Sequence, residues 1–263
     1  ATDSIATSGN AGKNAYTSET GSKGTGWVYT ENAAESDSYW YYLVSVKSTD
    51  GKNTYRNIPF NSHSGDEAWR AKTIKGKTYI FNSNGEMEDG LVILGNDGNG
   101  TTGKTNVYDA NGDATYDNKG GAVSKTMADG VYYFNEGNGS VNGQMVTGKT
   151  TVVDDGETYY YYFDKTTGRA ITDIVKDGVV YGHDGERIDA EDGNNNAIVT
   201  LDHDTYHNKK VNNATCAYIK AGSEVIVSST GKLRTSGTIK VDGVKCKVVP
   251  AADGNWTVER DVE

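Results

Sequence analysis

Proline, cysteine and long apolar runs are all scarce in this sequence. Its 263 residues include 2 prolines and 2 cysteines but 33 glycines, which argues against a disulfide-dense scaffold. No apolar stretch approaches the roughly 20 residues that a membrane-spanning helix needs, so membrane insertion is not expected. No stretch of about ten residues repeats its apolar side chains at the period of a helix. A helical fold is therefore not expected either.

Basic residues are outnumbered as well. The 26 lysines and arginines stand against 36 aspartates and glutamates, and the formal net charge is -10. A chain of this charge repels phosphate backbones, so nucleic acid is not an expected partner. Neutral polymers such as glucans carry no such penalty.

Tyrosine, valine and glycine are abundant instead, and they recur in a pattern. A short aromatic run followed by a glycine turn occurs in the segments 40–43, 77–90, 131–148 and 159–173. Alternating tyrosine and valine between glycine, asparagine and aspartate favours strands joined by tight turns. Because a single repeat cannot bury its own apolar face, the copies must stack on one another. We predict an all-β fold, a solenoid-like array of β-hairpin repeats with a small C-terminal β module.

The composition changes along the chain and predicts three regions. Residues 1–23 are rich in small polar residues and read as a flexible lead-in. Residues 24–193 carry the aromatic hairpin repeats, with a glycine-rich surface loop at 95–103. In residues 194–263 tyrosine thins out and valine-rich strands predict a separate small β module, in which Asp242-Gly243 forms a two-residue hairpin turn.

Both cysteines, Cys216 and Cys246, lie in this last region. An even pair in a small β module forms either a disulfide or two buried thiols, and the sequence leaves both open.

The segments Thr25-Gly26-Trp27-Val28 and Tyr39-Trp40-Tyr41-Tyr42-Leu43 resemble the choline-binding and glucan-binding repeat family of Gram-positive surface proteins. The resemblance implies successive β-hairpins whose aromatic faces form shallow sites for choline or sugar rings. The sequence departs from the family because Gly-Trp occurs once, at Gly26-Trp27. Later copies carry Thr147-Gly148-Lys149 or Asp89-Gly90-Leu91 at that place. A ladder of choline sites is therefore not expected, and a glucan site or a structural stalk accommodates the loss better.

Flat aromatic faces can pack on a pyranose ring or surround a quaternary ammonium. The candidate ligand-binding residues are Trp27, Trp40, Tyr42, Trp69, Tyr79 and Trp256. The alternative for each is a place in the core. In an alternating strand Trp40 and Tyr42 share one face while Tyr41 and Leu43 share the other, and one face must be core. The run Tyr159–Phe163 alternates in the same way.

Two motifs have metal-like spacing. His203 and His207 are four residues apart, but their surroundings are not helical, so we expect a surface loop. The segment Asp109–Asp113 is similar to a calcium loop but has its glycine at the wrong position, so we expect a turn. We predict no metal, no cofactor and no catalytic residue, because no nucleophile elbow, phosphate-binding loop or Cys-His pairing is present.

Together these features predict a secreted, non-catalytic, carbohydrate-binding module of a Gram-positive surface protein, part of a larger surface assembly. The expected ligand is an α-glucan of starch or dextran type, bound by stacking on tryptophan and tyrosine. One alternative is a module that anchors a protein by binding choline or another cell-wall polymer. The other is a stalk or adhesin spacer, in which every tryptophan would be buried.

Overall fold

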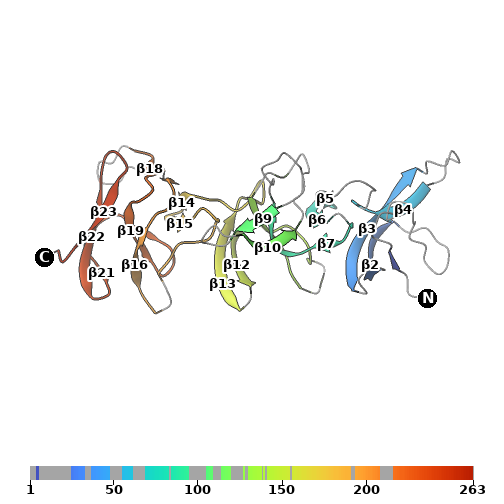
Figure 1. Ribbon diagram of the computed structural model, residues 1–263, viewed down its shortest axis with the longest axis horizontal. Coiled ribbons are helices and arrows are strands. Elements are labelled where there is room, and N and C mark those ends of the chain that lie inside the picture. Colours follow the sequence, from blue (N-terminus) through green and yellow to red (C-terminus); the bar gives the residue numbers. More distant parts are fainter. Residues whose placement is uncertain are drawn as a thin grey trace. The chain divides into compact units, whose positions relative to one another are not determined.

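The computed structural model of the protein consists of β-strands and turns, and no helix occurs among the residues it describes (Figure 1). These residues are 4–5, 25–32, 37–47, 55–61, 69–82, 84–94, 105–108, 114–119, 127, 130–137, 139, 141–154, 156–190, 193–207 and 216–262. The predicted all-β class of short antiparallel hairpins is confirmed. The chain divides into two compact units, Ala1–Val146 and Thr147–Glu263.

The first unit is built of small sheets. A four-stranded sheet has the order β1 (Ser4–Ile5), β2 (Gly26–Asn32), β3 (Ser38–Lys47) and β4 (Tyr55–Pro59). A three-stranded sheet follows with β5 (Arg70–Ile74), β6 (Lys77–Phe81) and β7 (Met87–Glu88). The unit also contains two two-stranded antiparallel sheets, one of β8 (Gly90–Leu94) with β11 (Gly130–Phe134) and one of β9 (Thr105–Tyr108) with β10 (Ala114–Lys119).

The second unit begins with the hairpin of β12 (Gly148–Asp154) and β13 (Glu157–Phe163). A four-stranded sheet has the order β15 (Val179–Tyr181), β14 (Ile174–Lys176), β17 (Thr205–Tyr206) and β18 (Tyr218–Ile219). A three-stranded sheet is formed by β16 (Asn196–Thr200), β19 (Glu224–Ser228) and β20 (Leu233–Arg234). The last sheet, near the C-terminus in Figure 1, is formed by β21 (Ile239–Val241), β22 (Val244–Pro250) and β23 (Trp256–Arg260).

Three predicted segments fall largely outside the described residues. They are the lead-in 1–23, of which only Ser4–Ile5 is described, the glycine-rich loop 95–103 and the segment Asp109–Asp113.

The aromatic strands alternate as the sequence predicts. In β3, Tyr41 and Leu43 are buried, while Trp40 on the opposite face is 39% exposed. In β13, Phe163 is fully buried and Tyr160 is 36% exposed. Successive side chains of a strand point to opposite faces, so each hairpin has one core face and one open face.

In each unit the buried face of one hairpin strand, β3 in the first and β13 in the second, meets the turn of a following hairpin. Tyr41 forms a β-bridge with Glu86, and Tyr161 forms one with Glu186. In both turns a backbone N–H donates to the glutamate carbonyl, from Asn82 at 2.9 Å and from Gly182 at 2.8 Å. The two turns therefore place corresponding residues at corresponding positions.

The two bridging glutamates differ in burial: Glu86 is buried and Glu186 is partly buried. Glu86 is 3% exposed, and its carboxylate accepts hydrogen bonds from the Tyr41 hydroxyl at 3.3 Å and the Asn82 amide at 2.7 Å. Burial, with the nearby charge of Asp184 acting in the same direction, raises the pKa of Glu186 to about 7. The turn of the second unit therefore contains a carboxyl group that resists ionisation.

One hydrophobic core organises the second unit. Its buried members are Val180, Leu201, Ile219, Val225, Ile226, Val227, Val241, Cys246, Val248, Trp256 and Val258. Val180 belongs to the predicted repeat region, and the others belong to the predicted C-terminal module. The predicted boundary between residues 193 and 194 thus lies inside the second compact unit. That the segments on its two sides fold independently remains a prediction.

Two local features of the second unit bear on the sequence analysis. Val241 pairs with Val244 across the turn Asp242-Gly243, whose residues have φ angles of 49° and 83°. Positive φ at both central residues is the geometry of a type I′ hairpin turn. Cys216 and Cys246 are free thiols, and of the two only Cys246 is buried, in the core of the second unit, whereas Cys216 is partly buried.

We predict that Ile226→Ala lowers the free energy of unfolding by about 2–5 kcal/mol, because it removes a fully buried side chain and leaves a cavity. The control Val244→Ala removes a side chain that is 37% exposed and changes stability by roughly 0.5 kcal/mol or less. Urea denaturation of both variants measures the difference. Equal losses would contradict the placement of the core.

Glu186 also makes stability depend on pH. Its folded pKa of about 7 lies above the ordinary value of 4.5. Between these values the folded state keeps a proton that the unfolded chain has released, so stability falls as the pH rises from about 4.5 to about 7. We expect Glu186→Gln to flatten this fall, whereas Glu259→Gln, at an exposed position of β23, leaves it in place. Denaturation midpoints at about pH 5 and about pH 8 measure it, and a fall that persists in Glu186→Gln would overturn the assignment.

Candidate functional site

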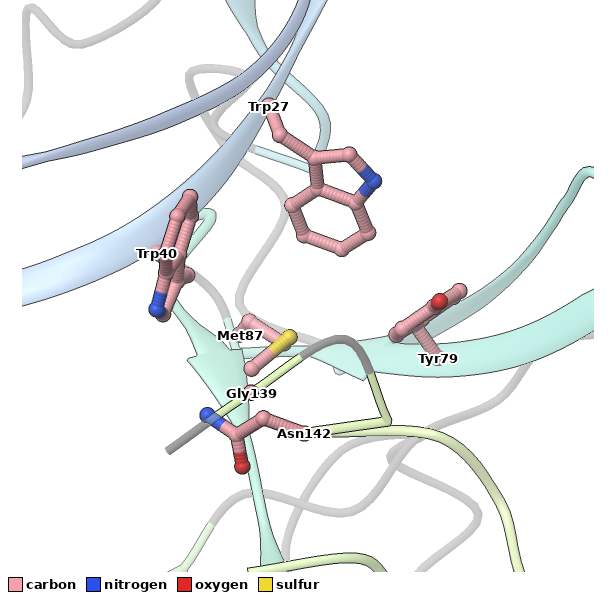
Figure 2. Close-up of a pocket in the computed structure, with 6 residues that line it drawn as sticks. All are labelled: Trp27, Trp40, Tyr79, Met87, Gly139 and Asn142. Carbon is pink, nitrogen blue, oxygen red and sulfur yellow. The ribbon is translucent and has the colours of Figure 1, made fainter. Parts of the chain in front are cut away.

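The first unit contains an open pocket of about 200 Å³. It is lined by Trp27, Trp40, Tyr79, Met87, Gly139 and Asn142. Figure 2 shows the three aromatic rings and the Met87 side chain on different sides of one space. None of the lining residues carries a formal charge at neutral pH, so the pocket offers aromatic faces, a thioether and an amide.

The rings meet at steep angles. The Trp27 centroid lies 6.3 Å from that of Trp40 with the planes 86° apart, and 4.7 Å from that of Tyr79 with the planes 65° apart. Trp27 also lies 5.9 Å from the buried Phe81 at 28°, which packs its ring against the core. The pocket walls are therefore a corner of rings and not a flat platform.

Strand register places the two tryptophans side by side. Trp27 pairs with Tyr42, and Tyr29 pairs with Trp40, in the antiparallel ladder of β2 and β3. All four side chains thus project from the same face, and Trp27 and Trp40 are diagonal neighbours on it. The open face of this hairpin is consequently aromatic.

The floor of the pocket comes from two later segments. Met87 begins β7, directly after the turn that bridges to Tyr41. Gly143 approaches it so closely that a Cβ at this position would overlap the Met87 sulfur. Asn142 precedes this glycine, and its side chain hydrogen-bonds to Asp89, whose carboxyl pKa is nevertheless raised by burial.

The structure brings together four of the six predicted site residues. Trp27, Trp40 and Tyr79 line the pocket, and Tyr42 touches Trp27 with a centroid distance of 5.2 Å. Trp69 is 6% exposed and packs in a core with Ile80 and Tyr132, and Trp256 is 1% exposed in the core of the second unit. Both buried tryptophans therefore belong to the core, which was the alternative stated for each candidate.

Three pocket residues, Met87, Gly139 and Asn142, were missing from the predicted set. Met87 had a signal, because Gly85-Glu86-Met87 closes the second aromatic repeat in the sequence. Asn142 had none, since it reaches the pocket through packing between hairpins.

Asp173, His183 and His203 could hold a metal ion, with ligand atoms within 4.8 Å of one another. The His183 Nδ1 lies 2.8 Å from the Asp173 carboxylate, and the two histidine rings stack at 3.9 Å. The expected surface position holds for His203, which is exposed, but not for His207, which is 3% exposed and packs on the Trp256 ring at a centroid distance of 5.4 Å. Both histidines thus have surroundings that sequence spacing alone did not indicate.

No protein-family model and no curated protein match this sequence. Among solved structures, it is similar to choline-binding protein F from Streptococcus pneumoniae, with 21% identity, a TM-score of 0.18 and coverage of 66% of this chain and 60% of that one. Truncated alternansucrase from Leuconostoc mesenteroides shares 15% identity with a TM-score of 0.27, over 95% of this chain and 17% of that chain. The modular autolysin LytC from Streptococcus pneumoniae shares 13% identity with a TM-score of 0.23, over 92% of this chain and 50% of that chain.

The chain therefore spans less than two thirds of the length of each of these proteins. In the described part of the chain, no helix is long and apolar enough to cross a membrane.

We predict that Gly143→Ala destabilises the first unit and displaces Met87. Gly143 has a φ of 69°, which costs an L-residue about 1–2 kcal/mol, and the added methyl also overlaps the Met87 sulfur. The control Gly76→Ala has a similar φ of 78° but no atom within 4 Å of the new Cβ. A larger loss of stability for Gly143→Ala, with a shift of the Met87 methyl resonance in that variant alone, is the expected result. Identical behaviour of the two variants would contradict the contact.

Proposed function

We propose that this protein is a non-catalytic binding module whose aromatic pocket takes a quaternary ammonium group such as choline. The observation that carries the proposal is the corner of Trp27, Trp40 and Tyr79 around one uncharged space. In a cell-wall setting the ammonium group would be carried by a wall polymer, so the module would serve in surface anchoring.

The geometry suits a compact cation. A cation is attracted to an aromatic face when it lies within about 6 Å of the ring centroid. Trp27 and Trp40 have centroids 6.3 Å apart and planes 86° apart, so one group in the corner lies within reach of both. Met87 adds a polarisable thioether. The net charge of -10 also attracts cations to the protein over a longer range.

A sugar ring makes a different demand. Stacking on a sugar needs a broad, accessible aromatic face. The α-glucan was expected from the sequence alone, which does not show the steep angles between these rings. One observation favours a glucan as second candidate. Tyr29 is 58% exposed and lies 5.2 Å from Trp40 at 44°, which extends the aromatic surface beyond the pocket.

The stalk alternative requires every tryptophan to be buried, but Trp27 and Trp40 are 36% and 39% exposed.

The non-catalytic part of the proposal is supported by the pocket lining. Its residues include no carboxylate, histidine, cysteine, serine or lysine, the groups that most often perform acid–base or nucleophilic chemistry. A secreted, surface-attached protein is the setting in which such a module would meet a wall polymer.

The test is a titration of the full chain with choline and with its neutral carbon isostere, 3,3-dimethyl-1-butanol, followed by tryptophan fluorescence. Cation–π contacts of about 1–2 kcal/mol from each ring give a dissociation constant on the order of millimolar for choline. The isostere has the same shape without the charge, so it should bind at least about tenfold more weakly. Equal binding of the two compounds would reject the ammonium site.

Two variants locate the site. Trp40→Ala removes one wall and should weaken choline binding about tenfold. Tyr206→Ala is the matched control, because Tyr206 is 38% exposed against 39% for Trp40 and lies in the second unit. Retention on insoluble starch or dextran that Trp40→Ala abolishes, with no response to choline, would establish the glucan candidate instead.

A further inference from the structure

The second unit has a pocket of about 280 Å³ whose lining differs in character from the aromatic pocket. The residues that matter for its chemistry are Lys149, Thr151, Tyr160, Arg187, Thr230 and Lys232. Its lining includes three cationic side chains and no carboxylate, although the chain as a whole is acidic.

Strand register shows that the two pockets occupy corresponding positions. In the first unit Gly26 pairs with Leu43, and Trp27 follows the glycine. In the second unit Gly148 pairs with Phe163, and Lys149 follows the glycine. Lys149 therefore stands where the first unit has Trp27. By the same count Tyr160, three residues before Phe163, stands where Trp40 precedes Leu43.

The bridged turns extend the correspondence. Met87 follows Glu86, and Arg187 follows Glu186, in turns that bridge the same strand position. A glycine lies against each side chain, because a Cβ on Gly143 would overlap Met87 and a Cβ on Gly231 would come within 2.5 Å of the Arg187 Cγ. The thioether of one pocket is thus replaced by a guanidinium in the other.

The remaining walls correspond as well. The Met145 N–H donates to the Thr78 carbonyl at 2.8 Å, and the Leu233 N–H donates to the Gly178 carbonyl at 2.9 Å. Asn142 lies three residues before Met145, and Thr230 lies three residues before Leu233, so Thr230 stands where the first unit has Asn142. The backbone framework is therefore shared, and the side chains have changed from aromatic and thioether groups to cations and hydroxyls.

Arg187 is held in place by its neighbours. Its guanidinium carbon lies 3.7 Å from the Tyr160 ring centroid, and its Nε donates to the Asp189 carboxylate at 2.6 Å. Asp189 also pairs with the Nη2 nitrogen, so one of the two guanidinium edges that can make a two-pronged contact is already used. Lys149 and Lys232 remain exposed at the pocket.

Exposed ammonium groups recognise phosphate as point charges, and threonine hydroxyls can donate to its remaining oxygens. We propose that the pocket of Lys149, Arg187 and Lys232 binds a phosphate group, either free or within a phosphodiester polymer. This site involves other residues than the aromatic pocket, so it holds or fails independently of the proposed function.

The test is an NMR titration of the full chain with inorganic phosphate, dimethyl phosphate and acetate at low ionic strength. The proposal expects saturable shifts of the Thr150, Thr151 and Thr230 amides with a phosphate compound, weaker binding of acetate, and loss of affinity on addition of salt. Response to dimethyl phosphate assigns the site to a phosphodiester, and response to inorganic phosphate alone assigns it to a free or terminal phosphate. Tighter binding of acetate, or no shift at these amides, would overturn the proposal.

Matched variants separate the site from general surface charge. Lys149→Gln and Lys232→Gln each remove one exposed cation and should weaken phosphate binding about tenfold without unfolding the protein. Lys245→Gln removes an exposed lysine of β22 outside the pocket and should leave the affinity unchanged. An equal loss in Lys245→Gln would show that phosphate responds to net charge and not to a site.

Discussion

The contact between a hairpin strand and the turn of a later hairpin is the constraint on which the rest of this structure depends. Tyr41 is fully buried where it bridges Glu86, and Tyr161 is 7% exposed where it bridges Glu186. A two-stranded hairpin is marginally stable by itself, so its apolar face needs such a neighbour. The contact decides which face of each strand is core. On the opposite face, Trp40 and Tyr160 stay exposed.

The open faces show how one backbone framework can serve two chemistries. In the first unit the face carries Trp27 and Trp40, and the following turn supplies Met87. In the second unit the corresponding places hold Lys149, Tyr160 and Arg187. Strand pairing and the bridged turns are made by backbone groups, and both units share them although their side chains at these places differ. The chemical character of the pocket can therefore change without a change of fold.

Much of the fold follows from local patterns. Alternation in the aromatic runs predicts which residues share a face, and the structure places Tyr41 and Leu43 inside and Trp40 outside. The turn at Asp242-Gly243 follows from its two residues. The tryptophans show the limit of such patterns. Trp69 and Trp256 have the same side chain as Trp27, yet they are buried because of what packs on them.

The sequence by itself determined the β class, the hairpin turns and the two faces of each aromatic strand, because these depend on interactions within a few residues along the chain. Only the tertiary structure decided which face is covered and which residues meet at each pocket. Trp27, Tyr79 and Asn142 are brought together by stacking of separate hairpins, as are Lys149, Arg187 and Lys232. Such contacts depend on the packing of segments that are distant in the sequence, and no local period of the sequence encodes that packing.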